Sequence, residues 1–260
     1  MTGWRGGLRA ALGRGAPLLG TFIKTADPAI AEILALAGFD LLVADLEHST
    51  LALADVVGIV RAAELHAVPV IVRVSAADLD AAGRLLETGA IGIQVTGVER
   101  AETLARMRAA TRFAPAGARS LAVSHRVAAF GRTSIGRYVD EAAASLVTVA
   151  QLESRAAVAA LPALLDSPDA PDVWFIGPVD LANDLGHPGG HDHPEVTAVL
   201  GGVLDALRDR RAAIGVFARD AADAIAWRAR GAQLILLGSD VTLLADAARA
   251  AVRGVQDRSA

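Results

Sequence analysis

Short apolar runs alternate along the chain with alanine-rich segments in which apolar residues recur at helical spacing. Several helical segments end in glycine, as at Gly38, Gly89 and Gly231, where a left-handed cap would precede the next strand. We predict eight strands: Leu18–Ile23, Leu41–Ala44, Val70–Val74, Ile91–Val95, Leu146–Leu152, Val173–Ile176, Ile214–Phe217 and Leu234–Leu237. We predict helices between them, at Pro28–Ala37, Leu53–Leu65, Leu79–Thr88, Ala101–Thr111, Arg155–Leu165, Glu195–Arg211 and Ala221–Arg230. This alternation favours an α/β fold, a (β/α)₈ TIM-type barrel, over the alternative of an open doubly wound sheet.

Two segments fall outside this alternation. Phe113–Val139 is too long for an ordinary connection and contains one proline and three glycines, so we predict a functional loop over the mouth of the barrel. Met1–Gly15 contains arginines and no acids, and no apolar signal-peptide core follows it. We interpret it as a short helix that closes the bottom of the barrel, with a transit peptide as the alternative.

Composition limits the domain count and the partners. A length of 260 residues is typical of one barrel, so we expect a single domain over residues 1–260. No apolar run approaches the roughly 20 residues of a membrane span, and we expect no membrane partner and a cytoplasmic location. The net charge is −4 and arginines are interspersed with acids, which gives no sign of nucleic-acid binding. The absence of cysteine excludes disulfides, thiolate metal sites and cysteine nucleophiles.

Two carboxylates end neighbouring predicted strands. Asp180 is the first polar residue after the strand that ends at Ile176, and Glu153 ends the preceding strand, where it shares a face with Gln151. Active sites of α/β barrels lie at these strand ends. Two carboxylates with open positions describe a site for a hard cation such as Mg²⁺ or Mn²⁺, and the backbone of Gly177–Asp180 offers N–H groups to an anion. The alternative is that both acids cap the helices that follow.

Charged residues also follow the first three predicted strands. Asp45 and His48 end the second strand, where the histidine could transfer protons and the carboxylate could orient its ring; the alternative is a solvated surface loop. Arg73 lies among β-branched residues and is costly to bury unpaired, so we expect a carboxylate partner and favour the substrate's over the protein's. Lys24 is the only lysine, so a Schiff-base mechanism would have to use it.

A loop with three histidines, His187, His191 and His193, suggests zinc at first sight. Its prolines and glycines indicate a mobile loop instead, and His193 lies where a cap would precede the helix from Glu195. The segment Gly186–Gly190 lacks the dinucleotide fingerprint, so neither a nicotinamide nor a flavin cofactor is expected.

A series of motifs resembles the HpcH/HpaI aldolase family over nearly the whole chain. The family comprises metal-dependent pyruvate aldolases related to 4-hydroxy-2-oxoheptanedioate aldolase. The motifs are Ala26-Asp27-Pro28, Ala37-Gly38-Phe39-Asp40, Asp45-Leu46-Glu47-His48, Val72-Arg73-Val74, Pro115-Ala116-Gly117-Ala118-Arg119, Gln151-Leu152-Glu153, Phe175-Ile176-Gly177-Pro178-Val179-Asp180-Leu181, His193-Pro194-Glu195-Val196, Gly238-Ser239-Asp240 and Thr242-Leu243-Leu244. Taken in this order, the set is specific.

The resemblance implies a barrel that assembles as a homohexamer, a trimer of dimers, with the last helix exchanged between subunits. It implies an aldolase that cleaves 4-hydroxy-2-oxo acids to pyruvate and an aldehyde, or forms them from these two, through a metal-bound enolate. Oxaloacetate is an alternative substrate to pyruvate. The metal would be Mg²⁺ or Mn²⁺, with Co²⁺ as an alternative. The implied residues are Glu153 and Asp180 for the metal; Arg73, Gln151, Gly177, Pro178, Val179, Phe22 and Glu87 for the substrate; and His48, Asp45 and Arg73 for catalysis.

Four features depart from the family's pattern. Thr96-Gly97 replaces a frequent Pro-Met or Pro-His, and Ser120 replaces glycine after an arginine. Glu87 stands where the aldolases tend to carry an aspartate from a neighbouring subunit, and Phe22 replaces an aromatic that is often tryptophan. The pyruvate half of the site is therefore expected to be intact and the aldehyde half altered. A citrate-lyase-like acyl-CoA lyase, which would need a basic groove for a nucleotide, and a non-catalytic barrel that binds a small acid are the alternatives.

Overall fold

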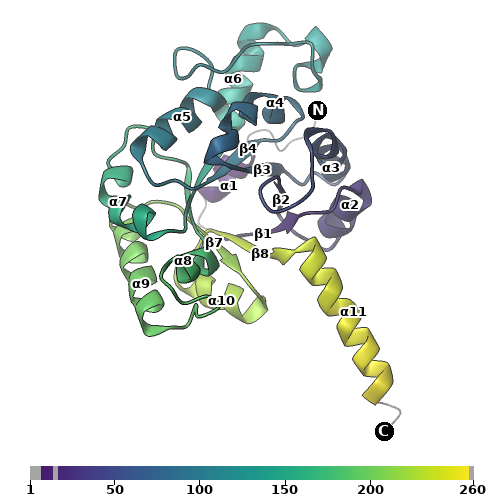
Figure 1. Cartoon of the computed structure of the whole chain (residues 1–260). Coiled ribbons are helices and arrows are strands. Elements are labelled where there is room, and N and C mark those ends of the chain that lie inside the picture. The colour runs from purple at the N-terminus through teal and green to yellow at the C-terminus, as the bar shows by residue number, and fades with distance from the viewer. Residues whose placement is uncertain (1–6, 14–16, 258–260) are drawn as a thin grey trace.

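The computed structural model describes residues 7–13 and 17–257. Eight parallel strands form a closed barrel in chain order, as the sequence predicts, and helices surround it (Figure 1). The strands are β1 Leu18–Ile23, β2 Leu41–Asp45, β3 Val70–Ser75, β4 Gly92–Thr96, β5 Val147–Leu152, β6 Val173–Ile176, β7 Ile214–Ala218 and β8 Leu234–Ser239. The α-helices are α1 Gly7–Leu12, α2 Pro28–Leu36, α3 Leu53–Leu65, α4 Ala82–Glu87, α5 Ala101–Thr111, α6 Ile135–Ser145, α7 Arg155–Leu165, α8 Pro178–Asp184, α9 Pro194–Asp209, α10 Ala221–Ala229 and α11 Asp240–Gln256. Two 3₁₀ segments, Ala76–Ala81 and Arg126–Gly131, complete the set.

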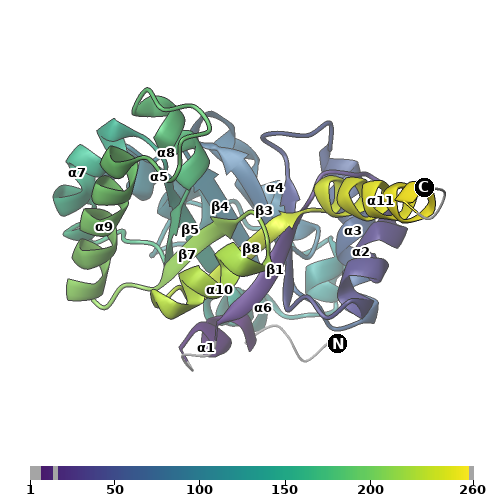
Figure 2. The same cartoon turned by 90° about the horizontal axis from the view of Figure 1, so that it is seen from below.

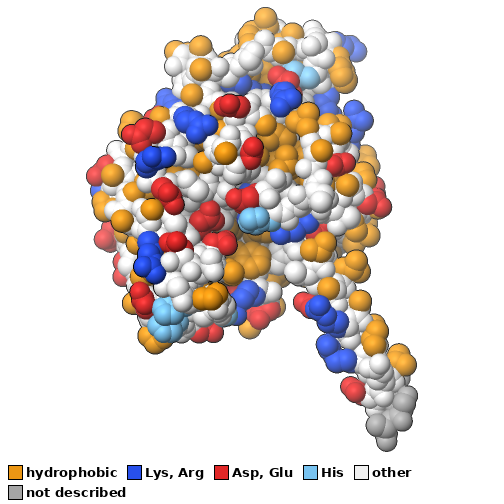
Figure 3. All heavy atoms as spheres, in the orientation of Figure 1, with side chains coloured by type: hydrophobic (Ala, Val, Ile, Leu, Met, Phe, Trp, Pro, Cys, Tyr) orange, Lys and Arg blue, Asp and Glu red, His pale blue; other side chains and the backbone are white. Residues whose placement is uncertain are grey.

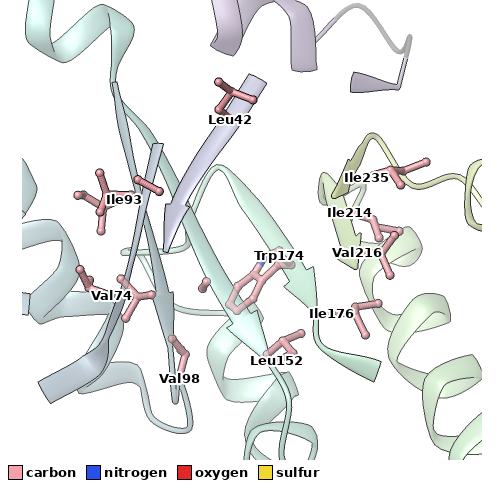
Figure 4. Packing of buried hydrophobic residues seen from close by; sticks show 14 of the residues in the cluster. Leu42, Val74, Ile93, Val98, Leu152, Trp174, Ile176, Ile214, Val216 and Ile235 are labelled. Carbon is pink, nitrogen blue, oxygen red and sulfur yellow. The ribbon is translucent and has the colours of Figure 1, made fainter. Parts of the chain in front are cut away.

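Alternating side chains divide the core into two layers. Leu41, Val43 and Ile71 point into the barrel, whereas Leu42 and its equivalents on other strands pack under the helices. Figure 4 shows part of this outer layer, with Trp174 beside other strand residues. Because both faces of each strand are covered, the strands read as continuous apolar runs, which is why the sequence predicts their positions to within two residues.

The N-terminal end of the barrel is closed by α1. Its Leu8 and Leu12 are buried against Leu18 and Leu41, the first residues of β1 and β2. This confirms a helix at the bottom of the barrel (Figure 2), while the rest of Met1–Gly15 lies outside the described residues apart from Gly13.

The segment Phe113–Val139 does not cover the mouth, and that prediction is wrong. Arg126 donates to Glu64 Oε1 at 3.1 Å and to the carbonyl of Thr88 at 2.9 Å, and both acceptors lie just before strands, at the N-terminal end of the barrel. Helix α6, which begins within this segment, lies near α1 at the same end (Figure 2). Length and composition signal an unusual connection, but only tertiary contacts decide which end of the barrel it covers.

Helix α11 projects from the barrel (Figure 1) and buries only its first residue, Asp240. Its Leu244 and Val252 are 67% and 56% exposed. Among the described residues, no helix has the length and apolar character needed to cross a membrane.

Candidate active site

Polar side chains occupy inward-facing positions near the C-terminal ends of several neighbouring strands. Asp45, Arg73 and Gln94 are register partners on β2, β3 and β4, and Gln151 follows on β5. All four are nearly inaccessible to solvent. The two amides are linked, since Gln94 Nε2 donates to Gln151 Oε1 at 2.7 Å. Sequence reasoning missed Gln94, although its inward position on a predicted strand was the available signal.

Arg73 and Asp45 form a buried, bidentate ion pair. Arg73 Nε and Nη2 donate to the two carboxylate oxygens of Asp45 at 2.9 and 2.6 Å. The guanidinium carbon also lies 4.3 Å from the ring centroid of Phe22. Arg73 therefore meets a carboxylate, as expected, but the partner of its fork is the protein's own Asp45 rather than a substrate.

The carboxyl of Asp45 is held in its ionised form. Burial alone would raise its pKa, but the hydrogen bonds and charge of Arg73, the backbone N–H of His48 and the charge of Lys24 outweigh burial and lower the pKa below its ordinary 3.8. Lys24 Nζ lies 3.3 Å from Asp45 Oδ2. The ammonium is therefore engaged with a buried carboxylate, whereas a Schiff-base mechanism needs a free amine at this position.

His48 is exposed at the mouth, and its expected orientation by Asp45 is not observed. Asp45 Oδ1 accepts the backbone N–H of His48 at 3.2 Å, whereas the nearest carboxylate to the imidazole Nε2 is Glu47, at 3.8 Å. The spacing in the sequence predicted that acid and histidine lie together, but it did not fix which acid faces the ring.

The negative charges of Glu47, which follows β2, and of Asp180, in α8, both act on Glu153, which follows β5. Burial raises the pKa of Glu153, and the negative charges of Glu47 and Asp180 raise it further, against the opposing hydrogen bonds from the backbone of Gly97 and the amide of Gln151. The Gly97 N–H donates to Glu153 Oε1 at 2.9 Å. Acids arranged in this way repel one another unless a proton or a cation neutralises them.

A cavity of about 260 Å³ lies at the mouth, and Lys24, His48, Arg73 and Asp180 are the charged or titratable residues that line it. Its lining comes from the strand ends and from the start of α8, and comprises Phe22, Lys24, His48, Arg73, Gln151, Phe175, Gly177, Pro178, Val179, Asp180, Phe217, Gly238, Ser239 and Thr242. Acidic side chains gather near the centre of this face, beside apolar ones (Figure 3). Helix α8, whose first turn carries Asp180, is not among the predicted helices, because it is only seven residues long and lies among prolines and glycines.

Gly177 lies tightly against this group. A Cβ there would lie 3.1 Å from Glu153 Cβ and 3.2 Å from Gln151 Nε2, while the backbone φ of −99° suits any residue. We expect Gly177→Ala to destabilise the fold by roughly 1–3 kcal/mol through overpacking and to lower turnover by displacing both side chains. Gly201→Ala in α9, where a Cβ would meet nothing within 4 Å, is the control, with stability and turnover measured for both. Unchanged turnover in the Gly177 variant would contradict the tight packing.

Glu87 is the one predicted site residue that lies away from this cavity. It ends α4 and its nearest histidine partner is His125 Nε2, at 4.0 Å, in the segment that packs at the other end of the barrel. Within one chain it therefore cannot contact a ligand in the mouth.

The histidine loop caps a helix, as the sequence predicts. His193 Nδ1 accepts the backbone N–H of Glu195 at 3.3 Å, and His187 Nε2 lies 2.8 Å from the Glu195 carboxylate. Among the described residues, these three alone bring three potential metal-ligand atoms within 4.8 Å of one another. The two imidazoles are stacked with centroids 3.6 Å apart, so one metal ion cannot lie in the planes of both rings without their rotation.

The model of the HpcH/HpaI aldolase/citrate lyase family matches residues 18–247. The chain belongs to the HpcH/HpaI aldolase/citrate lyase family. It is 34% identical to a hydroxypyruvate/pyruvate aldolase of Paraburkholderia phytofirmans, covering 92% of this chain and 94% of that one. It is also 34% identical to a 4-hydroxy-2-oxo-heptane-1,7-dioate aldolase of Klebsiella pneumoniae, over 92% of this chain and 90% of that one.

Solved structures of the HpcH/HpaI family share the fold. A family protein from Burkholderia cenocepacia superimposes with a TM-score of 0.89 at 33% identity, over 96% of this chain and 99% of that one. An HpcH/HpaI aldolase from Desulfitobacterium hafniense gives a TM-score of 0.87 at 31% identity, over 96% of each chain. The family expected from the motifs is thus confirmed, together with its barrel.

Proposed function

We propose that this protein is a divalent-metal-dependent aldolase, a carbon–carbon lyase. It cleaves 4-hydroxy-2-oxo acids to pyruvate and an aldehyde, and forms them in the reverse direction. The observation that carries the proposal is the arrangement of the mouth, with Glu153 and Asp180 on the β5–β6 side and the cations Lys24 and Arg73, paired with Asp45, on the β1–β3 side. Relatives named as aldolases of hydroxypyruvate/pyruvate and of a 4-hydroxy-2-oxo diacid support it.

Glu153 and Asp180 would hold the metal. Their ligand atoms are carboxylate oxygens, which suit Mg²⁺ or Mn²⁺; burial, together with the charges of Glu47 and Asp180, raises the pKa of Glu153, and a bound cation would offset both effects. When bound, a divalent cation stabilises the negative charge that develops on the keto oxygen of the substrate. The choice among Mg²⁺, Mn²⁺ and Co²⁺ stays a prediction.

The chain's own groups would bind the substrate and move its proton. The remaining nitrogen of Arg73, Nη1, and the amide of Gln151 would donate to the keto acid, and the N–H groups of Val179 and Asp180 in the first turn of α8 would point at its carboxylate. His48, exposed at the mouth, would take the hydroxyl proton of the aldol as the carbon–carbon bond breaks. Phe22 and Val179 would exclude water around the reacting carbons.

The decisive experiment separates metal from Schiff-base chemistry. Oxaloacetate decarboxylation and pyruvate aldol addition are measured before and after chelation, and again with added Mn²⁺ or Mg²⁺. Loss on chelation and recovery with metal are expected, and borohydride with pyruvate should leave the intact mass unchanged. Chelator-resistant turnover together with a reduced adduct on Lys24 would overturn the proposal.

We also propose a homo-oligomer, a hexamer or trimer of dimers in which α11 packs on another subunit. The apolar residues of α11 are exposed in the single chain, and Glu87 could reach a cavity only in a neighbouring subunit.

The cytoplasmic location expected from the sequence stays a prediction.

Light scattering tests the role of α11. The intact protein should have a mass several times 26.7 kDa, and Leu244→Asp with Val252→Asp should reduce it, because charges would be buried at the contact. Arg249→Ala, on the same helix but in an exposed pair with Asp246, should leave the mass unchanged. A monomeric intact protein would contradict the assembly.

A further inference from the structure

Lys24 places a second cation at the cavity. The Asp45 carboxylate is already neutralised and hydrogen-bonded without it. The Asp45 carboxylate already accepts two guanidinium N–H groups and the backbone N–H groups of Glu47 and His48. The ammonium of Lys24 adds one contact at 3.3 Å, and Asp45 is the only carboxylate within 4.0 Å of it among the described residues. With three donors and a side chain that is 26% exposed, Lys24 keeps hydrogen-bonding capacity directed at the cavity.

Arg73 cannot supply the hydrogen bonds that Lys24 can donate to a ligand in the cavity. Nε and Nη2 of Arg73 both bind Asp45, so the edge of the guanidinium that could grip a carboxylate through two parallel bonds is occupied. Because Arg73 Nη2 and Lys24 Nζ approach the same Asp45 oxygen, the two cations are neighbours that share one buried counter-charge. An anion of the substrate would complete the charge balance.

The backbone holds Lys24 in place from the far side. Asp240, which is 6% exposed and begins α11, accepts the backbone N–H of Lys24 at 3.0 Å and that of Thr25 at 2.9 Å. Thr21 Oγ1 donates to the carbonyl of Leu237 at 2.8 Å, which further joins β1 to β8. The lysine therefore projects from a fixed segment rather than from a mobile loop.

The position of Lys24 in the barrel indicates which end of a substrate it meets. Lys24 directly follows β1 and Glu153 directly follows β5, and in a closed barrel of eight strands in chain order these two strands are opposite one another. A keto acid held on the Glu153 side would thus extend its acceptor half toward Lys24. The hydroxyl-bearing residues Ser239 and Thr242 line the same wall.

We propose that Lys24 determines acceptor specificity by binding a carboxylate on the aldehyde. The preferred acceptors are then short aldehydes with an acid group next to the reacting carbon, since the cavity measures about 260 Å³. This inference rests on the proposed aldolase function and names the substrate class of the same site.

The test compares glyoxylate with glycolaldehyde, two acceptors of similar size that differ in charge, with pyruvate as the donor. In Lys24→Met the ratio of kcat/KM for glyoxylate to that for glycolaldehyde should fall roughly 10- to 100-fold, as expected for a lost charged hydrogen bond, mainly through KM for glyoxylate. Lys24→Arg should recover much of the ratio. Arg61→Met, which removes an exposed cation from α3, should leave the ratio at the wild-type value.

Two results would overturn this role. An unchanged ratio in Lys24→Met would show that the lysine does not recognise the acceptor, and an equal loss with both acceptors would assign it to the donor or to the support of Asp45. Melting temperatures show whether each variant is folded, and Lys24→Gln, which removes the charge but keeps a polar group beside Asp45, provides the decision if Lys24→Met is not. Absence of aldol addition in the wild type would instead refute the aldolase function, and this inference with it.

Discussion

Glu153→Ala and Asp180→Ala are each expected to abolish metal-dependent turnover. Both carboxylates belong to the acidic side of the mouth, and loss of one fixed charge from an electrostatic site costs about 10²–10³-fold in rate or more. Both variants should also lose stabilisation by Mn²⁺, which in a competent protein reaches about 2.7 kcal/mol at a metal concentration one hundred times Kd. Turnover and melting temperature with and without Mn²⁺ test this.

In the metal-free protein, loss of the Glu153 charge should increase stability, although it removes activity. Because the folded state raises the pKa of Glu153, the ionised carboxylate destabilises the fold at neutral pH, and protonation relieves this as the pH falls. Glu153→Gln should therefore raise the melting temperature of chelated protein while removing its activity.

A control acid separates this effect from a general change in charge. Asp209→Asn, on the exposed end of α9, should alter neither activity nor the response to Mn²⁺. Full activity in both the Glu153 and the Asp180 variants would show that the two acids do not hold the metal; they are not helix caps either, because Ser154 caps α7 and Gly177 precedes α8.

The sequence was sufficient for features that depend on local pattern. Buried parallel strands are continuous apolar runs, so β6 is predicted at its observed bounds, Val173–Ile176. Carboxylates that directly follow such strands must lie at one end of a barrel, which brings Glu153 and Asp180 to the same mouth. Helix α3 is also predicted at its observed bounds, because its apolar residues keep a helical spacing throughout.

Features set by contacts between distant segments could not be predicted in this way. The fork of Arg73 binds Asp45 because β2 and β3 pair in a register that places them side by side, which no local spacing reveals. The direction of the His48 ring, toward Glu47, depends on the turn after β2. Arg126 meets Glu64 across 62 positions of the chain, and this contact fixes the long segment at the N-terminal end.

Breaking the Arg73–Asp45 pair is expected to cause the largest loss of stability. Arg73→Met would leave a carboxylate with a fully buried side chain and only Lys24 as its charged partner, and removal of one member of a buried pair costs about 3–5 kcal/mol. Arg73→Lys keeps the charge but loses the bidentate geometry, so an intermediate loss is expected. Urea unfolding at neutral pH measures the free energy of each variant.

The loss should depend on pH in a defined direction. The pKa of Asp45 is lower in the folded than in the unfolded protein, so its stabilising effect is complete above the ordinary value of 3.8 and disappears as the pH falls through the folded value. The difference between wild type and Arg73→Met should therefore shrink as the pH falls toward and below 3.8.

A double variant and an exposed ion pair serve as controls for the buried pair. Arg73→Met combined with Asp45→Asn should be less destabilised than the sum of the single variants, because no unpaired buried charge remains. Arg137→Met removes an exposed partner of Glu141, with a side chain 62% exposed, and should cost little at any pH. If Arg73→Met cost no more than Arg137→Met, the pair would contribute nothing to the fold, and Arg73 would be free to bind the keto acid with its whole fork.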